Sequence, residues 1–498
     1  MPFYPIFSTP LITALFLVLT LAAALAVMEH LVARGAISKT ASRRLVHVLA
    51  GSAIFSCRFI FEQPTYPVLV ALLFLAINLL TLRKGLLASI HGIAGKSYGT
   101  VFFPLAYAAL ALLFWTRDPV ALQTGVLLLT VADPLAGWVG QTWGRRTFAL
   151  WAENKTLPGS VAMFSAAALI WAASGGLLLP LAGLPAWTAT QLALGVPLGA
   201  AVVTIAEIHS RAGSDNLTVP LAGTLFMALF AALPADSFTG LALWSTGSGV
   251  LLAGAVWLPA LSRSGMLGAW VMGLFIFLAG GWTWLLPIIV FFVASSLLSL
   301  ARRAAKAGPT VRRDLRQVFA NGGPAMAAAI VFGISGPMGW QIEGLYSVFL
   351  AALAAATADT WATEIGKWSR TPPRNIITGE VVVPGTSGGV TWLGTAGSLA
   401  GAALLAITGR LLAPELLSAS QAAVVLLIGF GAALVDSLLG ATLQARFTSP
   451  GTGPSEDRPA DMSAVTVTGW GWLDNNMVNL THGSLAALLA LAWLAWYH

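Results

Sequence analysis

Long apolar runs separated by short polar clusters make up most of the chain. A helix needs about 20 apolar residues to cross a bilayer, and the breaks between runs fall at charged, Pro and Gly clusters. The pattern therefore predicts an all-α polytopic membrane protein with about sixteen transmembrane helices. The expected helices begin near residues 11, 44, 66, 101, 119, 160, 188, 217, 240, 265, 282, 319, 341, 389, 420 and 478.

The composition agrees with this interpretation. Of the 498 residues, 57% are hydrophobic and 9% are charged, whereas a soluble domain carries about 25% charged residues. The first apolar run, Leu11 to Ala33, is too long for the core of a signal peptide and has no basic segment before it. We expect it to be the first span. The single cysteine, Cys57, excludes intramolecular disulfides and cysteine-based metal sites.

Positive charge is divided unevenly between alternate loops. With the N-terminus outside, the inside loops collect every lysine and arginine except Arg58, Arg117 and Arg410. The positive-inside rule predicts this asymmetry. We therefore expect a prokaryotic cell-membrane protein whose basic loops face the cytoplasm, where nucleotides are. The net charge of +7 reflects this orientation and requires no nucleic-acid partner.

Two acids stand inside apolar segments, where an ionisable side chain is costly and is by default a functional candidate. Asp133 shares one helix face with Gly137 and Gly140, at i+4 and i+7. Asp359 and Gly366 repeat the first and last of these positions. A seam of small residues for helix packing would explain the glycines but not the acids. We interpret each aspartate as the marker of an active site.

Further polar elements recur in the same order in each half. Each has a structural alternative: a membrane anchor for the arginines, a capped turn for the loops and the Asp–Asn pairs, and an ion pair with Arg211 for Glu207. Half one contains Arg43, Arg44 and His47, then Lys155, Thr156, Gly159 and Ser160, then Glu207, then Asp215 and Asn216. Half two contains Arg312, Arg313, Gln317 and Asn321, then Gly385, Thr386 and Gly388, then Asp436, then Asp474 and Asn475.

The order and sidedness of these elements predict two parallel repeated halves. The span counts between corresponding elements differ by even numbers, so the copies are not inverted. The acids cluster at the cytoplasmic boundary, unlike the midplane sites of inverted-repeat transporters. We expect one membrane domain at residues 1–240 and a second at 241–498.

These motifs resemble known kinase families. In half one, Arg-Arg-x-x-His, Ala-Asp-x-x-Ala-x-x-x-Gly and Lys-Thr-x-x-Gly-Ser resemble the phytol kinase and dolichol kinase family, integral membrane polyprenol kinases that use CTP or related nucleotides. In half two, the segments around Asn321, Asp359, Thr386 and Asp474 are similar to the phytyl-phosphate kinase family. The resemblance implies consecutive phosphorylation of phytol, or a related polyprenol, to the monophosphate and then the diphosphate.

Phosphoryl transfer needs charge neutralisation and alignment more than covalent chemistry. Mg²⁺ suits this task because it keeps several waters and uses few protein carboxylates. In half one the nucleophile is an alcohol, so His47 is a second candidate base. In half two it is already a phosphate anion, which rationalises Gln317 in the place of His47. No lysine stands beside Thr386, so its phosphate charge would be met by Lys367, Arg374, metal or loop amides.

The resemblance and this chemistry together define the expected sites. The catalytic candidates are Asp133, Asp359, His47, Glu207 and Asp436. The nucleotide- and phosphate-binding candidates are Arg43, Arg44, Lys155, Thr156, Gly159, Ser160, Asn216, Arg313, Asn321, Lys367, Arg374, Gly385, Thr386, Gly388 and Asn475. The candidate ligands of Mg²⁺ are Asp133, Asp215, Asp359, Glu364, Asp436 and Asp474.

Two other functions stay open at this point. A CTP-dependent lipid cytidylyltransferase also uses intramembrane acids and a nucleotide, but its product is a cytidyl-linked lipid. A duplicated ion-coupled transporter would need its acids at mid-depth in the membrane. The expected partners are the isoprenoid alcohol and its monophosphate, CTP or another nucleoside triphosphate, and the lipid bilayer.

Overall fold

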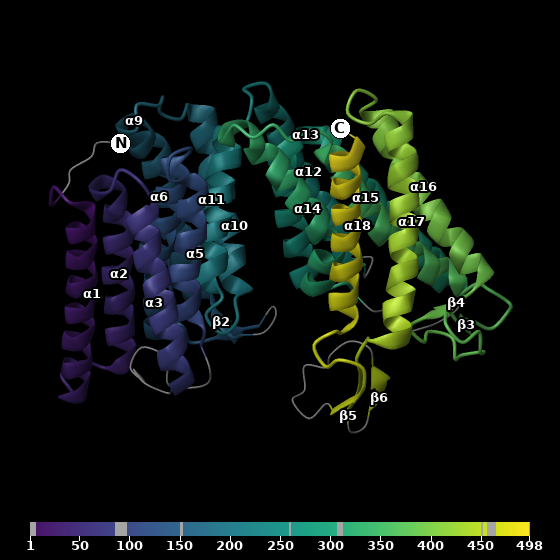
Figure 1. The fold of residues 1–498 in the computed structure, drawn as a ribbon, viewed down its shortest axis with the longest axis horizontal. Coiled ribbons are helices and arrows are strands. Elements are labelled where there is room, and N and C mark those ends of the chain that lie inside the picture. The colour runs from purple at the N-terminus through teal and green to yellow at the C-terminus, as the bar shows by residue number, and fades with distance from the viewer. Residues whose placement is uncertain are drawn as a thin grey trace. The chain divides into compact units, whose positions relative to one another are not determined.

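A computed structural model describes residues 6–84, 97–149, 153–257, 260–305, 312–449, 452–455 and 465–497. Most of these residues lie in helices (Figure 1), which confirms the all-α membrane fold. Among the described residues, twelve helices are long and apolar enough to cross a membrane, and Gly99–Phe114 and Asp215–Ala231 are shorter apolar helices. Three basic residues of the expected inside set, Lys96, Lys306 and Arg458, lie outside the described residues.

A helix begins within a few residues of each expected start except 282, where the chain changes direction inside a helix. The count is lower than sixteen for three reasons. Helix α2 (Lys39–Ile60) is rich in basic and small residues, and α5 (Gly99–Phe114) and α11 (Asp215–Ala231) are short. Helix α13 (Arg263–Ala305) counts once, although Gly281 has a non-helical φ of 65°. The number of helices that cross the bilayer stays a prediction.

The contacts within the chain divide it into two compact units, Met1–Phe238 (unit 1) and Thr239–His498 (unit 2). This division falls close to the join expected between residues 240 and 241. The assignment of a separate activity to each half stays a prediction.

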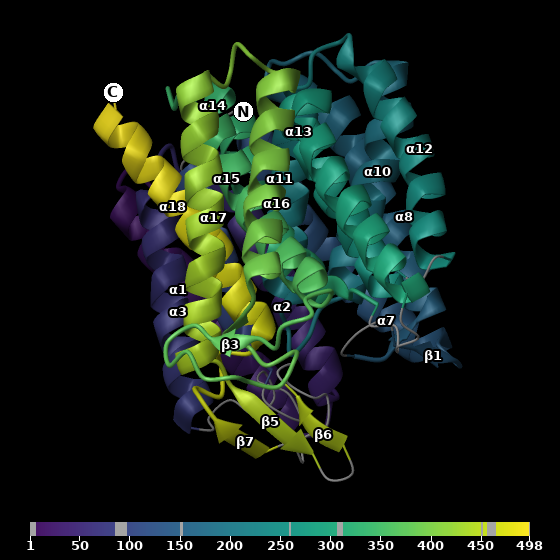
Figure 2. The same cartoon turned by 90° about the vertical axis from the view of Figure 1, so that its right-hand side faces the viewer.

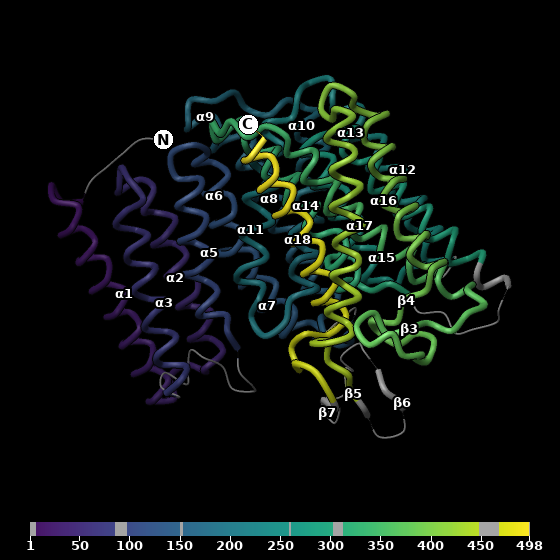
Figure 3. The backbone as a smooth tube through the Cα atoms, turned by 45° about the vertical axis from the view of Figure 1, so that its right-hand side comes forward, coloured from purple at the N-terminus to yellow at the C-terminus, as the bar shows by residue number. Residues whose placement is uncertain are grey.

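Unit 1 is a helical bundle with a polar end. In Figure 3, α1, α2 and α3 run side by side, and α5 packs against α3. The polar end gathers the start of α2, helix α7, a two-stranded sheet and the α10–α11 connection. Besides α2, α5 and α11, its elements are α1 (Pro10–Ala33), α3 (Thr65–Lys84), α6 (Pro119–Leu127), η1 (Leu128–Ala132), α7 (Asp133–Trp143), β1 (Thr147–Phe148), β2 (Lys155–Thr156), α8 (Leu157–Ala173), η2 (Ser174–Leu178), α9 (Leu179–Leu181) and α10 (Ala189–Ile208).

The helix that carries Asp133 is irregular immediately before the acid. The segment η1 is a π-turn, and the Asp133 N–H donates to the Leu128 carbonyl across it. Pro134 follows, and its ring has no N–H to donate. Such π-bulges are rare and frequently occur at functional sites. The regular α-helical hydrogen bonding is therefore interrupted immediately before Asp133, which lies at the polar end.

Unit 2 is built around α15 (Leu345–Gly366). Helices α13, α14, α16, α17 and α18 all pack on it, and every residue from Leu345 to Ala358 is buried. Asp359 is the first residue after this buried run. The other elements are α12 (Ser237–Trp257), α14 (Leu315–Met338), β3 (Arg374–Asn375), β4 (Gly389–Val390), α16 (Trp392–Leu412), α17 (Ala419–Thr442), β5 (Arg446–Ser449), β6 (Thr452–Ser455), β7 (Val465–Thr468) and α18 (Asn475–Tyr497).

Helix α13 folds back on itself at Gly281. Met272 in its first arm and Ile288 in its second both approach Gly322 of α14, so the two arms lie together against that helix. The antiparallel sheet β6–β5–β7 lies beyond the ends of α17 and α18 (Figure 2). The hairpin of α13 explains why two spans were expected at 265 and 282.

The glycines after each membrane aspartate allow close helix packing. A Cβ on Gly140 would lie 3.4 Å from the Cα of Gly159, and a Cβ on Gly366 would lie 3.4 Å from the Cα of Gly394. The hydroxyl of Thr156 accepts the Gly159 N–H and caps α8.

The same cap recurs in unit 2, where the Thr391 hydroxyl accepts the Gly394 N–H and caps α16. By this cap, Thr391 and not Thr386 resembles Thr156. The pairing of residues 153–160 with 384–389 stays a prediction, as does the repeat on which it rests.

We expect Gly159→Ala to destabilise unit 1 by about 1–3 kcal/mol, the usual cost of overpacking. Its Cβ would lie 3.1 Å from the Ala136 carbonyl and 3.2 Å from the Cα of Gly140, so α7 and α8 must separate. Thermal unfolding in detergent measures the effect. Gly137→Ala is the matched control, because nothing lies within 4 Å of its Cβ position. Equal unfolding temperatures for the two variants would contradict the packing argument.

Candidate functional site

The polar end of unit 1 encloses a cavity of about 710 Å³. It lies between the start of α2, α7, the segment before β2 and the α10–α11 connection. Its walls carry both signs of charge, with arginines from α2 and acids from α7, α10 and α11. The predicted residues that line it are Arg43, Arg44, His47, Asp133, Lys155, Glu207, Asp215 and Asn216.

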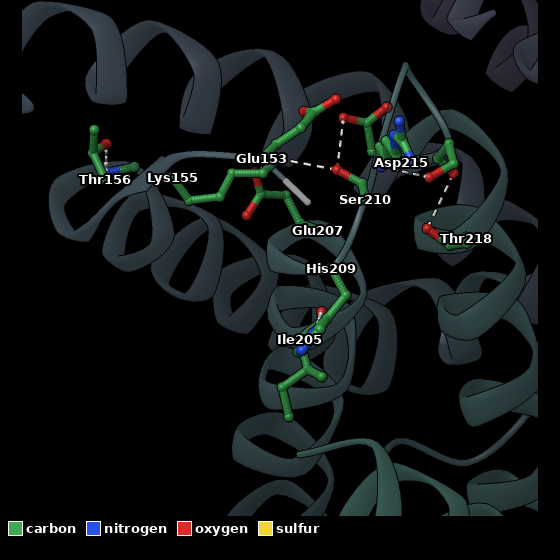
Figure 4. Close-up of polar contacts among 12 residues, drawn as sticks. Glu153, Lys155, Thr156, Ile205, Glu207, His209, Ser210, Asp215 and Thr218 are labelled. Carbon is green, nitrogen blue, oxygen red and sulfur yellow. Dashed lines mark hydrogen bonds and ion pairs between the residues drawn. The ribbon is translucent and has the colours of Figure 1, made fainter. Parts of the chain in front are cut away.

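A chain of polar contacts crosses this cavity (Figure 4). The Lys155 ammonium donates to Oε1 of Glu207 at 2.7 Å and to the Ser210 hydroxyl at 3.0 Å. The Ser210 hydroxyl donates to Oδ2 of Asp215 at 3.4 Å. Oε2 of Glu207 is buried and has no hydrogen-bond partner among the described residues. The alternative partner expected for Glu207, Arg211, is not the one it takes.

The acids around Lys155 keep it charged. Burial opposes the charged form, but the adjacent Glu207 carboxylate, with Asp215 and Asp133 further away, outweighs burial and raises the pKa of Lys155 above its ordinary value. Lys155 is thus a fixed positive charge in the cavity wall at neutral pH. A point charge of this kind suits a nucleotide phosphate.

His47 and Asp133 meet where α2 passes η1 and α7. Nε2 of His47 lies 3.8 Å from Oδ2 of Asp133 and 2.8 Å from the Leu129 carbonyl oxygen. Because a carbonyl only accepts, Nε2 carries the proton in that contact and Nδ1 holds the lone pair of the neutral ring. The side chains of Arg43 and Arg44 are held beside them, by the Ser97 hydroxyl at 3.2 Å and by the Gln141 side chain respectively.

An apolar groove of about 150 Å³ runs along α2 and ends at the same residues. Its walls come from α1, α2, α3 and α5, and include Leu21, Ala50, Phe74 and Phe103. Arg43, His47 and Asn216 line both the groove and the polar cavity. The Cys57 and Tyr107 side chains line the groove about three helical turns beyond His47.

Unit 2 encloses a cavity of about 730 Å³ between α14, α15, α17, the start of α18 and the 384–391 loop. Acids and cations again share its walls. Lys367 lies 3.8 Å from Glu364, and Arg370, which was not among the candidates, also lines it. The predicted residues that line this cavity are Arg313, Asn321, Asp359, Glu364, Lys367, Gly385, Thr386, Gly388, Asp436 and Asn475.

A buried histidine supports the acids of unit 2. His482 on α18 is fully buried, and its Nδ1 lies 2.9 Å from Oδ1 of Asp436. The carboxyl groups of Asp436 and Asp359 lie close enough to interact. Sequence reasoning missed His482. The available signal was a histidine in an apolar helix seven residues after Asn475, which is the spacing of one helix face.

An apolar groove of about 80 Å³ also joins the cavity of unit 2. Its walls come from α12, both arms of α13 and α14, and include Leu252, Met272 and Phe292. Arg313, Gln317 and Asn321 line both spaces. Gln317 is in the first turn of α14 and Arg313 lies four residues before it, just ahead of the helix, whereas Arg43 and His47 both lie on α2.

Some predicted site residues have other roles. Thr156 and Gly159 form the cap of α8, and Ser160 is buried beside them, so none of the three lines the cavity. Arg374 donates to the Gly379 carbonyl at 2.8 Å on the surface and lies outside the cavity.

Asp474 is also outside the cavity. Its carboxylate accepts the Met477 N–H at 3.0 Å, which is the capping alternative. The amides of Thr386 and Gly389 donate within their own loop and are not available to a phosphate.

The donors in unit 1 fit a metal that arrives with other ligands. Among the described residues, no group of three or more His, Cys, Asp or Glu side chains could hold a metal ion. The residues Asp133, Glu207 and Asp215 nevertheless line one cavity. Mg²⁺ usually takes one or two carboxylates and completes its shell with water and phosphate oxygens.

Comparison with known proteins identifies the family. Residues 246–487 match the family model described as integral membrane protein DUF92. An uncharacterized membrane protein of Methanocaldococcus jannaschii is 32% identical over 37% of this chain and 76% of its own length. A phytol kinase of Synechocystis is 30% identical over 37% of this chain and 76% of its length. A probable chloroplastic phytol kinase of Oryza sativa is 28% identical over 40% of this chain and 66% of its length.

The chain belongs to the phytol kinase-like family of integral membrane proteins. No solved structure matches the chain. Membership in this family supports a membrane enzyme that handles an isoprenoid, and it agrees with a site where an apolar groove meets a charged cavity.

We expect Lys155→Met to lower the free energy of unfolding of this kinase-like protein by about 3–5 kcal/mol, because it leaves the buried Glu207 without its partner. Because the pKa of Lys155 is raised in the folded protein, its ion pair with Glu207 contributes fully to stability below the pKa of an ordinary lysine, about 10.4. This contribution is lost as pH rises through the pKa of Lys155 in the folded protein. Thermal unfolding of wild type and variant across this range measures it.

The double variant Lys155→Met/Glu207→Gln is the control. It removes both charges and should recover most of the lost stability. A double variant as unstable as Lys155→Met alone would mean that the lysine acts through packing.

Proposed function

We propose that the chain is a bifunctional isoprenoid kinase. Unit 1 transfers the γ-phosphoryl group of CTP, or of another nucleoside triphosphate, to phytol or a related polyprenol. Unit 2 phosphorylates the resulting monophosphate to the diphosphate. The family membership supports the first activity at the level of the class of substrate and reaction. The second activity rests on the likeness between the two sites.

One arrangement carries the proposal. In each unit an apolar groove and a charged cavity share an arginine and, four residues later in the sequence, a polar residue. These are Arg43 and His47 on α2 in unit 1, and Arg313 just before α14 and Gln317 in its first turn in unit 2. An isoprenoid tail requires an apolar channel, and a triphosphate requires cations and polar space. The shared residues are where the head of the lipid would meet the terminal phosphate.

In unit 1 the nucleophile is a neutral alcohol. Its oxygen forms a bond to the γ-phosphorus as the bond to the β-phosphate oxygen breaks, and Asp133 accepts the alcohol proton. His47 stands beside Asp133 with its Nε2–H directed at the Leu129 carbonyl, so Nδ1 is the ring atom able to accept a proton. Lys155, Arg43 and Arg44 neutralise the phosphate charge.

In unit 2 the nucleophile is already an anion and needs no base. The monophosphate oxygen attacks the γ-phosphorus, and the obstacle is repulsion between two phosphates. Arg313 before α14, and Lys367 and Arg370 just after α15, supply positive charge from two segments of the wall. Gln317 and Asn321, which also border the groove, can donate to the incoming phosphate without removing a proton.

The acids in each cavity would hold Mg²⁺ together with the nucleotide phosphates: Asp133, Glu207 and Asp215 in unit 1, and Asp359, Glu364 and Asp436 in unit 2. When bound, the ion neutralises developing charge on the phosphoryl oxygens. The protein groups contribute alignment and the positive wall.

The two-site proposal predicts separable losses. With phytol, nucleotide and Mg²⁺, Asp133→Asn should abolish the monophosphate, because it removes the acid at the head of the groove in unit 1. Asp359→Asn should let the monophosphate accumulate without the diphosphate. Resolution of the two lipid products by chromatography measures both outcomes. Intact diphosphate formation by Asp359→Asn would refute the assignment of the second step to unit 2.

The groove of unit 1 predicts a specific KM effect. Ala50 lines the groove, so Ala50→Trp should raise the KM for the alcohol at least tenfold and leave the nucleotide KM unchanged. Ser52→Trp on the exposed side of the same helix is the control and should leave both values unchanged. Kinetics with each substrate varied in turn make the measurement. An unaltered alcohol KM for Ala50→Trp would place the tail elsewhere.

A further inference from the structure

The second acid of each cavity has a different partner in the two units. In unit 1, Oε1 of Glu207 near the end of α10 takes the Lys155 ammonium at 2.7 Å, and that lysine lines the cavity. In unit 2, Oδ1 of Asp436 near the end of α17 takes Nδ1 of His482 at 2.9 Å. His482 belongs to α18, is fully buried and is not part of the cavity lining.

When Asp436 is ionised, its hydrogen bond with His482 has one direction. An ionised carboxylate only accepts, so the His482 ring donates through Nδ1–H to Asp436. Nε2 of His482 is buried and has no hydrogen-bond partner among the described residues. The ring therefore offers its Nδ1–H to Asp436. Its other nitrogen, Nε2, is buried and does not line the cavity.

We propose that His482 is a positioning residue for the reaction of unit 2, which holds the Asp436 carboxylate in place of the lysine that performs this task in unit 1. The proposal rests on the proposed function of unit 2. By holding Oδ1 from behind, His482 turns the other carboxylate oxygen toward Asp359 and the phosphates in the cavity.

This arrangement has a physical advantage at a site that joins two anions. A lysine that reaches its acid through the cavity, as Lys155 does, occupies space beside the nucleotide. A histidine that reaches the acid from the protein side leaves that space for the second phosphate. Such supporting hydrogen bonds to reactive or metal-binding groups typically change activity by about 10–100-fold when removed.

The test compares variants that keep or remove the donor at the position of Nδ1. His482→Asn places an amide N–H near that position, whereas His482→Gln places it near the position of Nε2, and His482→Leu removes it. With the lipid monophosphate as acceptor, the variants His482→Leu and His482→Gln should lower kcat about 10–100-fold. The KM for the monophosphate should change little. His482→Asn should stay within a few-fold of wild type.

Two further measurements separate positioning from folding. Monophosphate formation from phytol by unit 1 of the same variant should be unchanged, which reports an intact protein. His482→Leu combined with Asp436→Asn should be no slower than Asp436→Asn alone, because the histidine acts through that acid.

The inference is overturned if His482→Leu forms diphosphate at the wild-type rate, or if His482→Asn lowers kcat as much as His482→Leu does. It is also overturned if the losses in kcat of His482→Leu and Asp436→Asn multiply in the double variant. Failure of the proposed function looks different, because wild-type protein would then form no diphosphate from the monophosphate.

Discussion

A carboxylate buried at the polar end of these helices is strongly destabilising unless a partner holds it. The structure meets this requirement locally. Lys155 pairs with Glu207, and His482 pairs with Asp436. These pairs fix where the polar cavities can form. In the rest of each unit, close contacts at glycines pack the helices together, and the apolar grooves lead to the polar cavities.

The two sites share a plan and differ where their substrates would differ. In both, an arginine and the polar residue four positions later line the groove and the cavity, and a threonine-capped helix packs on the acid-bearing one. Unit 1 has a histidine at the junction, which suits an alcohol that must lose a proton. Unit 2 has Gln317 there, and its acid Asp436 is held by His482, which lies outside the cavity lining.

The sequence predicted the parts of the structure that follow from local pattern. Apolar runs located nearly every helix, and Asp133, Glu207, Asp359 and Asp436 were recognised because acids in such runs are rare. The cavity linings show that these acids gather at one end of each unit.

Features that depend on three-dimensional packing were not predictable in this way. A capping threonine and a phosphate-binding threonine look alike in sequence, so Thr156 was given a binding role that its hydrogen bond to Gly159 does not support. Asp474 is a similar case, since its carboxylate caps α18 and does not line the cavity. His482 was missed because only the packing of α18 on α17 brings it to Asp436. The grooves were missed because their walls come from several separate helices.

The transfer of a phosphoryl group, and not a nucleotidyl group, to the lipid is the central claim. The most direct measurement supplies the purified protein with unlabelled lipid monophosphate and CTP labelled in either the γ- or the α-phosphate. The account predicts that the γ-label appears in a lipid diphosphate, that the α-label stays in water-soluble CDP, and that no pyrophosphate is released. Lipid-bound α-label with release of pyrophosphate would show a cytidylyltransferase and would contradict the account.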